Sequence, residues 1–305
     1  YVWHYLPKAA PDQQWRGITG KARRAAIGGA WVARLRVQAR RHDIVHVHSA
    51  STLAHARLGA PRYVLHCHGT DVRTAQYDPA RQAGIRGGLR DAEAVFFSTP
   101  DLAEHVLPHR EDAVYVPVPV DVDAVEPWQP GEGRPRVVFA SRWTADKDST
   151  DPAAGQLAVA RAVVAAVGDE ADVVGVDWGP QAAEAAALGV RLVPRRDHAG
   201  YLELLSGSNV VIGQTAGILA ASEVEALAAG TPLVVPVPLP LYTDVDPPVY
   251  GGSVPEAAEA VRALLDGSQA HDPEVARKWV RDRHGVEHAV DTVARVHREV
   301  VAARR

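Results

Sequence analysis

The sequence of 305 residues has a single cysteine, Cys67, and no methionine. One cysteine cannot form a disulfide within the chain, which is compatible with a reducing cytoplasm. No apolar run approaches the roughly 20 residues that a helix needs to cross a bilayer. The chain also lacks an excess of positive charge: its formal net charge is −4, which argues against a dedicated nucleic-acid-binding protein. We therefore expect a cytoplasmic globular protein with no nucleic-acid partner.

What the sequence does contain is an alternation of short apolar runs with longer helical patterns. Such alternation is typical of α/β architecture with parallel strands. The length of the chain suits two domains of ordinary size. The apolar runs predict strands in the first half at 1–6, 43–48, 63–67, 94–98 and 113–118, and in the second half at 137–141, 172–177, 190–194, 209–214 and 233–237.

A stretch rich in proline, glycine and charge, residues 126–136, predicts the boundary between the two domains. We expect an N-terminal acceptor-side domain at 1–128, a linker at 129–135 and a C-terminal donor-binding domain at 136–283. The remaining residues, 284–305, form a helical tail that is expected to cross back to the first domain. Two doubly wound domains facing each other bind ligands in the cleft between them, outside the carboxyl ends of the strands.

Two segments of the second half carry charged residues where predicted strands end. In ASRWTADKDS, residues 140–149, Arg142 and Lys147 follow a buried strand. In SEVEALAAGTPLVV, residues 222–235, Glu225 stands on the opening turn of a predicted helix. Two cations and one carboxylate suit a nucleoside diphosphate, because the cations bind the pyrophosphate and the carboxylate accepts from the ribose hydroxyls. Each of these residues has a simpler interpretation, as a solvated cation or as a carboxylate favoured by the helix dipole.

These segments resemble the donor site of GT-B fold glycosyltransferases of the GT4-like type (glycosyltransferase group 1). The resemblance lies in the spacing of five between Arg142 and Lys147 and in the EAxAxGxP run that begins at Glu225. It implies two Rossmann-like domains and a hexosyl transferase that retains the anomeric configuration. The donor is then a nucleotide-diphospho-sugar, with UDP or GDP as nucleotide, and neither a metal nor another cofactor is required. Arg142 and Lys147 are implied to stabilise the departing diphosphate.

The sequence departs from this family at Gly217, where the family often has a glutamate eight residues before the second one. The backbone amides of Gly217, Ile218 and Leu219 are expected to bind the β-phosphate at a helix N-terminus. The missing glutamate leaves two alternatives open. One is a non-catalytic GT-B protein that binds a nucleotide or a glycan, as an accessory subunit. The other, less favoured, is a nucleotide-sugar epimerase.

Four histidines form two HxH pairs, His46 with His48 and His66 with His68. Because side chains alternate along a strand, each pair points to one face, and on neighbouring strands the four imidazoles would meet. A metal site is one interpretation. The resemblance favours another, because VLHCHGTD matches the family segment in which a histidine, here His68, faces the reacting sugar. Our prediction is therefore a catalytic His68 and no metal.

The acceptor side is predicted around the ends of the same two strands, with His48, Ser49 and Asp71 as candidates. The sequence is equally compatible with three classes of acceptor, namely a glycan, a lipid-linked sugar and a small molecule. Upstream, the basic segment 16–41 has no acidic residue. It suits a phosphorylated acceptor or peripheral contact with an anionic membrane, and a solvated helix face explains it equally well. Its basic residues are Arg16, Lys21, Arg23, Arg24, Arg34, Arg36, Arg40 and Arg41.

Overall fold

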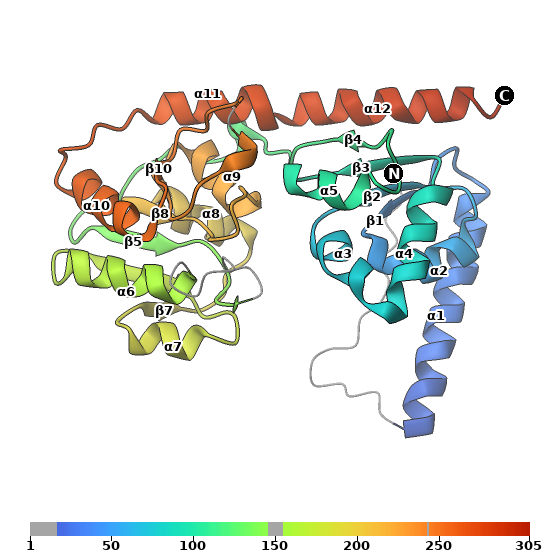
Figure 1. Ribbon diagram of the computed structural model, residues 1–305, viewed down its shortest axis with the longest axis horizontal. Coiled ribbons are helices and arrows are strands. Elements are labelled where there is room, and N and C mark those ends of the chain that lie inside the picture. Colours follow the sequence, from blue (N-terminus) through green and yellow to red (C-terminus); the bar gives the residue numbers. More distant parts are fainter. Residues whose placement is uncertain (1–16, 146–154, 243) are drawn as a thin grey trace. The chain divides into compact units, whose positions relative to one another are not determined.

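The computed structural model describes residues 17–145, 155–242 and 244–305, and these form two compact units (Figure 1). Unit 1 comprises the described residues up to Pro117 together with Val290–Arg305, and unit 2 comprises Val118–Ala289. Each unit has its own parallel β-sheet, as the alternating sequence pattern predicts. Over the described ranges, none of the helices has the length and apolar character that crossing a membrane requires.

Unit 1 is built on a four-stranded parallel sheet whose strands follow one another in chain order. The predicted strand at 1–6 lies outside the described residues. The strands are β1 (His46–His48), β2 (Val64–Cys67), β3 (Ala94–Phe97) and β4 (Val114–Tyr115). The helices are α1 (Gly17–Ala39), α2 (Leu53–Gly59), α3 (Thr70–Arg73), α4 (Pro79–Asp91), α5 (Ala103–Val106) and, from Val290 on, α12 (Val286–Ala302).

The two faces of this sheet differ in chemistry. Alternate strand residues, such as Val47, Leu65 and Val95, enter an apolar core with residues of α2 and α4. The opposite face carries His46, His48 and His66 with Phe96, and His297 of α12 packs against it edge-on. The strand period of two therefore puts both HxH pairs on one face, away from the apolar core.

Unit 2 is a six-stranded parallel sheet in the order β10-β9-β8-β5-β6-β7. This is the order of Rossmann-type sheets, with the reversal of strand order between β5 and β8. The strands are β5 (Arg136–Phe139), β6 (Asp172–Val176), β7 (Arg191–Val193), β8 (Val210–Ile212), β9 (Leu233–Val235) and β10 (Tyr250–Gly251). The helices are α6 (Gln156–Val167), α7 (Ala182–Ala187), α8 (His198–Ser206), α9 (Ala221–Ala229), α10 (Val254–Leu265) and α11 (Pro273–His284).

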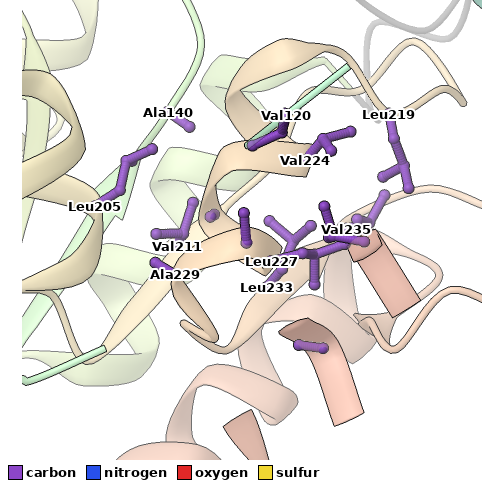
Figure 2. Close-up of a cluster of buried hydrophobic side chains, with 14 of the residues drawn as sticks. Val120, Ala140, Leu205, Val211, Leu219, Val224, Leu227, Ala229, Leu233 and Val235 are labelled. Atoms are coloured by element: carbon purple, nitrogen blue, oxygen red, sulfur yellow. The ribbon is translucent and has the colours of Figure 1, made fainter. Parts of the chain in front are cut away.

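Both faces of the second sheet are apolar, because helices cover each of them. On β5, Val138 enters one buried cluster, whereas Val137 and Phe139 enter the other. The first cluster includes residues of α8, α9 and α11, and the second includes residues of α6, α7 and α10. Figure 2 shows the first cluster, where Leu227 of α9 lies with Leu233 of β9.

The units divide at a different place from the sequence-based boundaries, because the segment after Pro117 packs with unit 2. Val120, Val122 and Val125, which the sequence assigned to the domain 1–128, are buried in the same cluster as Leu227. The amide of Val120 also donates to the carbonyl of His284 at 2.8 Å. The proline-rich stretch that suggested a linker therefore follows the point of division. The tail returns to unit 1 from Val290, within α12, rather than from the start of the predicted segment 284–305.

Candidate functional site

The loop after β5, which carries Arg142, is tied to the elements around it. The amide of Ala140 donates to the carbonyl of Ile212 on β8 at 3.1 Å, and its carbonyl accepts from the hydroxyl of Tyr201 at 2.7 Å. The hydroxyl of Ser141 donates to the carboxylate of Glu223 on α9 at 3.3 Å. This loop thus lies at the carboxyl edge of the sheet and at the reversal of strand order, where open α/β sheets bind ligands.

Arg142 belongs to a cluster of cations around an exposed tryptophan. Its guanidinium carbon lies 5.8 Å from the ring centroid of Trp178, and that of Arg195 lies 4.6 Å from the same ring. Arg142 also donates to the hydroxyl of Thr144 at 3.2 Å. Trp178 remains 45% exposed. Two guanidinium groups and an aromatic ring offer charge for an anion and a face for a planar group.

Sequence reasoning missed Trp178 and Arg195. Their signal was their position, since each follows a predicted strand, β6 and β7 respectively, at the same edge as Arg142. The second predicted cation, Lys147, lies outside the described residues.

The loop between β8 and α9 is organised by a buried glutamate that the sequence also left unassigned. Glu223 is 1% exposed. One of its carboxylate oxygens accepts from the amide of Gln214 at 2.9 Å, and the other accepts from the amide of Ala220 at 3.0 Å. Because these two amides flank Gly217, a single carboxylate holds both ends of the loop that was predicted to bind phosphate.

The three residues whose amides are predicted to bind phosphate, Gly217, Ile218 and Leu219, have different local conformations and hydrogen bonds. Gly217 has φ 70°, in the region that favours glycine. Ile218 is buried, and its carbonyl accepts from the side-chain amide of Gln214 at 3.3 Å. The amide of Leu219 donates to the hydroxyl of Tyr242 at 3.1 Å. In this structure the donor of Leu219 is therefore engaged within the loop, whereas its predicted role in binding phosphate stays a prediction.

Glu225, the predicted ribose ligand, is paired with a histidine in this structure. Its carboxylate lies 2.8 Å from Nε2 of His198, and the two side chains are 15% and 71% exposed respectively. Nearby, burial together with the carboxylates of Glu223 and Glu225 raises the pKa of Tyr201, which keeps its hydroxyl protonated. Glu225 thus lies on α9, the helix that follows β8, and its present partner is an exposed side chain.

In unit 1 the predicted residues His48 and His68 are brought together. Nδ1 of His48 and Nε2 of His68 are 2.9 Å apart and hydrogen-bonded, with the rings stacked at 5.2 Å. Burial lowers the pKa of both, and Asp71 partly offsets this for His68. Ser49 has φ 73°, and its hydroxyl accepts from the amide of Ser51 at 3.3 Å. His48, Ser49 and His68 therefore share one edge of the sheet.

Asp71, predicted on the acceptor side, is held by backbone donors of the surrounding loops. It is 4% exposed, and its carboxylate accepts from the amides of Ala50 and Gly69, each at 2.8 Å. It also accepts from the amide of His68 at 3.2 Å. A buried carboxylate that accepts from several backbone amides fixes the loops around it, and the acceptor-side role of Asp71 stays a prediction.

The inner histidines of the two HxH pairs continue the row toward the interior. The ring of His66 stacks on that of His68 with centroids 4.3 Å apart, and His46 stacks on His48 at 4.6 Å. Burial, followed by the neighbouring imidazoles, lowers the pKa of His46 to about 3 and that of His66 to about 2. Both rings are therefore neutral at physiological pH.

The basic segment 16–41 corresponds mainly to α1, and Arg16 lies outside the described residues. The basic side chains whose burial the structure describes are exposed. One of them, Arg36, also donates to the carbonyl of Leu58 on α2 at 2.7 Å, which ties the helix to unit 1. The other exposed members are Lys21, Arg23, Arg34, Arg40 and Arg41. The basic segment that the sequence indicates is thus a helix with exposed, positively charged side chains.

Comparison with known proteins finds the same architecture in glycosyltransferases. The sequence model of the glycosyl transferase 4-like domain matches residues 3–121. Sucrose-phosphate synthase from Thermosynechococcus elongatus is 16% identical with a TM-score of 0.63, over 91% of this chain and 79% of that one. HepE of Anabaena, crystallised with UDP-glucose, is 16% identical with a TM-score of 0.67, over 87% and 81%. AviGT4, a glycosyltransferase involved in avilamycin A biosynthesis, is 19% identical with a TM-score of 0.59, over 89% and 79%. No curated protein sequence matches the chain.

Proposed function

We propose that this GT-B fold chain, which carries a glycosyl transferase 4-like domain over residues 3–121, transfers a sugar from a nucleotide-diphospho-sugar to an acceptor hydroxyl. The observation that carries the proposal is the grouping of Arg142, Trp178 and Arg195 at the carboxyl edge of the unit 2 sheet. Cations at the reversal point of a Rossmann-type sheet suit a nucleoside diphosphate. HepE, which shares the fold, was crystallised with UDP-glucose, and this supports a nucleotide-linked donor.

In this proposal the donor is held by residues of several strand ends. Arg142 and Lys147 neutralise the diphosphate, and the amides at Gly217 and Ile218 bind its distal phosphate. Glu225 accepts from the ribose hydroxyls once the exposed His198 turns toward solvent. His68 of unit 1 donates to a hydroxyl of the sugar, a role taken from the family resemblance. The amide of Leu219 joins the two phosphate-binding amides only if it exchanges its hydrogen bond with Tyr242 for one to the phosphate.

The chemical step follows from the charges available. As the glycosidic bond breaks, negative charge develops on the diphosphate, and cations fixed beside it lower the barrier. Glu223 is unsuited to act as a nucleophile, because three donors already occupy its carboxylate. We therefore propose front-face transfer with retention, in which the leaving phosphate takes the proton of the acceptor hydroxyl. Since basic side chains neutralise the phosphates, the proposed step uses no bound cation and no other cofactor.

The test is a thermal-shift panel of UDP, GDP, ADP and dTDP, followed by transfer assays with the sugar of the nucleotide that binds. A ligand that binds only the native state raises the midpoint, and saturation at 100 times Kd stabilises by about 2.7 kcal/mol. Arg142→Ala is expected to reduce both this shift and kcat, the latter by roughly 10²–10³-fold, since one donor to the developing charge is lost. Lys147→Ala is expected to act in the same direction.

Arg262→Ala is the matched control, because Arg262 is exposed in the last turn of α10, and helices of parallel α/β units end at the opposite edge of the sheet. It should leave binding and turnover unchanged. Unchanged turnover in both Arg142→Ala and Lys147→Ala would refute the assignment. Nucleotide binding without transfer to any acceptor would favour the non-catalytic alternative, which the glycine at position 217 motivates.

The residues of the site define the donor more closely than the acceptor. The proposal includes a glycan, a lipid-linked sugar and a small molecule as acceptors. The exposed cations of α1 support the first contact being made at an anionic membrane surface. Each basic residue near such a surface contributes about 1 kcal/mol. Co-sedimentation with vesicles that contain anionic lipid measures this contact.

A further inference from the structure

The histidine-bearing face of the unit 1 sheet has a geometry that sugar transfer does not explain. β1 and β2 pair in parallel with His48 opposite His66, so the two HxH motifs lie side by side. The rings of His46 and His66 are 5.6 Å apart, and those of His48 and His66 are 5.5 Å apart. One ring nitrogen from each of His46, His48 and His66 lies within 4.8 Å of the other two. Three imidazole nitrogens therefore converge on one small volume.

The buried nitrogens of this cluster lack the partners that buried polar atoms normally have. Nε2 of His46 and Nε2 of His66 have no hydrogen-bond donor or acceptor among the residues that the structure describes. His66 is only 7% exposed, so water does not supply the missing contact freely. Buried polar atoms in folded proteins are nearly always satisfied. Two orphaned nitrogens beside each other call for a group that accepts electron pairs from both.

Imidazole is a ligand for zinc and the neighbouring divalent metals, and three histidines with one open position form a known type of zinc site. We propose that His46, His48 and His66 form a binding site for a divalent transition metal of this class, with Zn²⁺ as the expected ion. Zn–N bonds are about 2.0–2.1 Å long, so the three rings turn inward from their stacked positions when the ion binds.

The surroundings of the cluster favour this assignment. His46 and His66 stand on paired neighbouring strands of one sheet, which holds their rings on the same face. The bond between His48 and His68 is an outer-shell contact of the kind that fixes a ligand's tautomer. Cys67, between His66 and His68, enters the apolar core on the opposite face and is not a ligand.

This inference departs from the sequence-based prediction, in which the resemblance of VLHCHGTD to the family segment left no metal. It assigns His68 no direct bond to the ion, so the proposed contact of His68 with the sugar is unaffected. The site also does not depend on sugar transfer. Its test therefore uses metal binding as the readout, and its outcome is independent of whether the protein is an active transferase.

The experiment titrates the whole chain, freed of metal with a chelator, with Co²⁺, which reports tetrahedral nitrogen ligands by its visible absorption. Zn²⁺ competition then gives its affinity. The variants are His46→Gln and His66→Gln. His42→Gln is the matched control, because His42 is exposed and its ring contacts the carbonyl of Gln38 at 2.9 Å, outside the cluster. Circular dichroism and the thermal midpoint of each metal-free variant show whether it is folded.

We expect the wild type to bind one equivalent of Co²⁺ per chain, with Zn²⁺ displacing it and raising the thermal midpoint. Loss of one ligand should weaken binding by at least about 100-fold, more than loss of an outer-shell partner does. The control should bind as the wild type does. If His66→Gln does not fold, His46→Gln, at a less buried position, decides the question. Absence of binding by the wild type, or equal binding by the folded cluster variants and the control, would overturn the proposal.

Discussion

Glu223 gives the sharpest test of how the candidate donor site is held together. Its carboxylate accepts from the amides of Gln214 and Ala220 and from the hydroxyl of Ser141. These contacts join the loop after β5 to both ends of the loop before α9. Glu223→Gln keeps the shape of the side chain but replaces one acceptor oxygen with an NH₂ donor. In either orientation of the amide, that donor faces an N–H group that needs an acceptor.

The size of the effect follows from the number of bonds changed. A hydrogen bond to a charged group contributes about 1.5–3 kcal/mol, and a buried donor left without a partner costs about 1–3 kcal/mol. The substitution loses one such bond outright and removes the charge from the others. We therefore expect Glu223→Gln to lower the free energy of unfolding of unit 2 by roughly 2–5 kcal/mol.

Urea unfolding, followed by circular dichroism and by hydrogen exchange, measures this change. One of the two amides, that of Gln214 or that of Ala220, should exchange faster in the variant, because it loses its acceptor, while the other keeps an uncharged one. Glu203→Gln is the matched control, since Glu203 is exposed on α8 of the same unit. If nucleotide binding depends on the loop, the Kd for the bound diphosphate should rise in Glu223→Gln alone. A stability change within about 0.5 kcal/mol, with unchanged exchange at both amides, would refute the reasoning.

Two further predictions concern unit 1. Burial opposes ionisation of Glu93, but hydrogen bonds from Arg304 and Arg62 outweigh it and hold its pKa below the ordinary value of 4.5. The native state therefore binds fewer protons, so the stability that Arg304→Gln removes should be present above pH 4.5 and vanish as the pH falls through the native pKa. Urea unfolding between about pH 3 and pH 7 measures this, and a difference independent of pH would contradict it. Separately, Lys21→Glu with Arg34→Glu should weaken binding to anionic vesicles by at least about 30-fold, since each basic residue contributes about 1 kcal/mol. Vesicles of neutral lipid are the control, and equal binding of the variant and the wild type would exclude α1 as the contact.

Local pattern was sufficient to predict the scaffold and to select candidate site residues. Parallel strands buried on both faces appear in a sequence as continuous apolar runs, and helices interrupt them. The runs at 94–98 and 172–177 accordingly became β3 and β6. Because ligands bind at the carboxyl ends of such strands, the positions of Arg142 and Glu225, together with the family resemblance, made them candidates for the donor site. His48 became a candidate because it stands where β1 ends, and His68 because VLHCHGTD resembles the family segment.

Other features depend on contacts between residues that are distant in the sequence. Nothing local indicates that Glu223 is buried beneath two loop amides, or that Arg195 packs on Trp178. Composition marked the stretch 126–136 as a linker, but Val120 and its neighbours belong to the core of unit 2, because burial of apolar side chains outweighs a local preference for loops.

The four histidines of the two HxH pairs separate what the sequence determined from what the tertiary structure decided. The sequence by itself determined that His46 and His48 share a face, and that His66 and His68 do, because the period of a strand is two. Only the tertiary structure decided that β1 and β2 are neighbours with His48 opposite His66. Strand pairing and register are set by the packing of the whole sheet rather than by either strand alone. That pairing turned two separate motifs into one cluster of imidazoles.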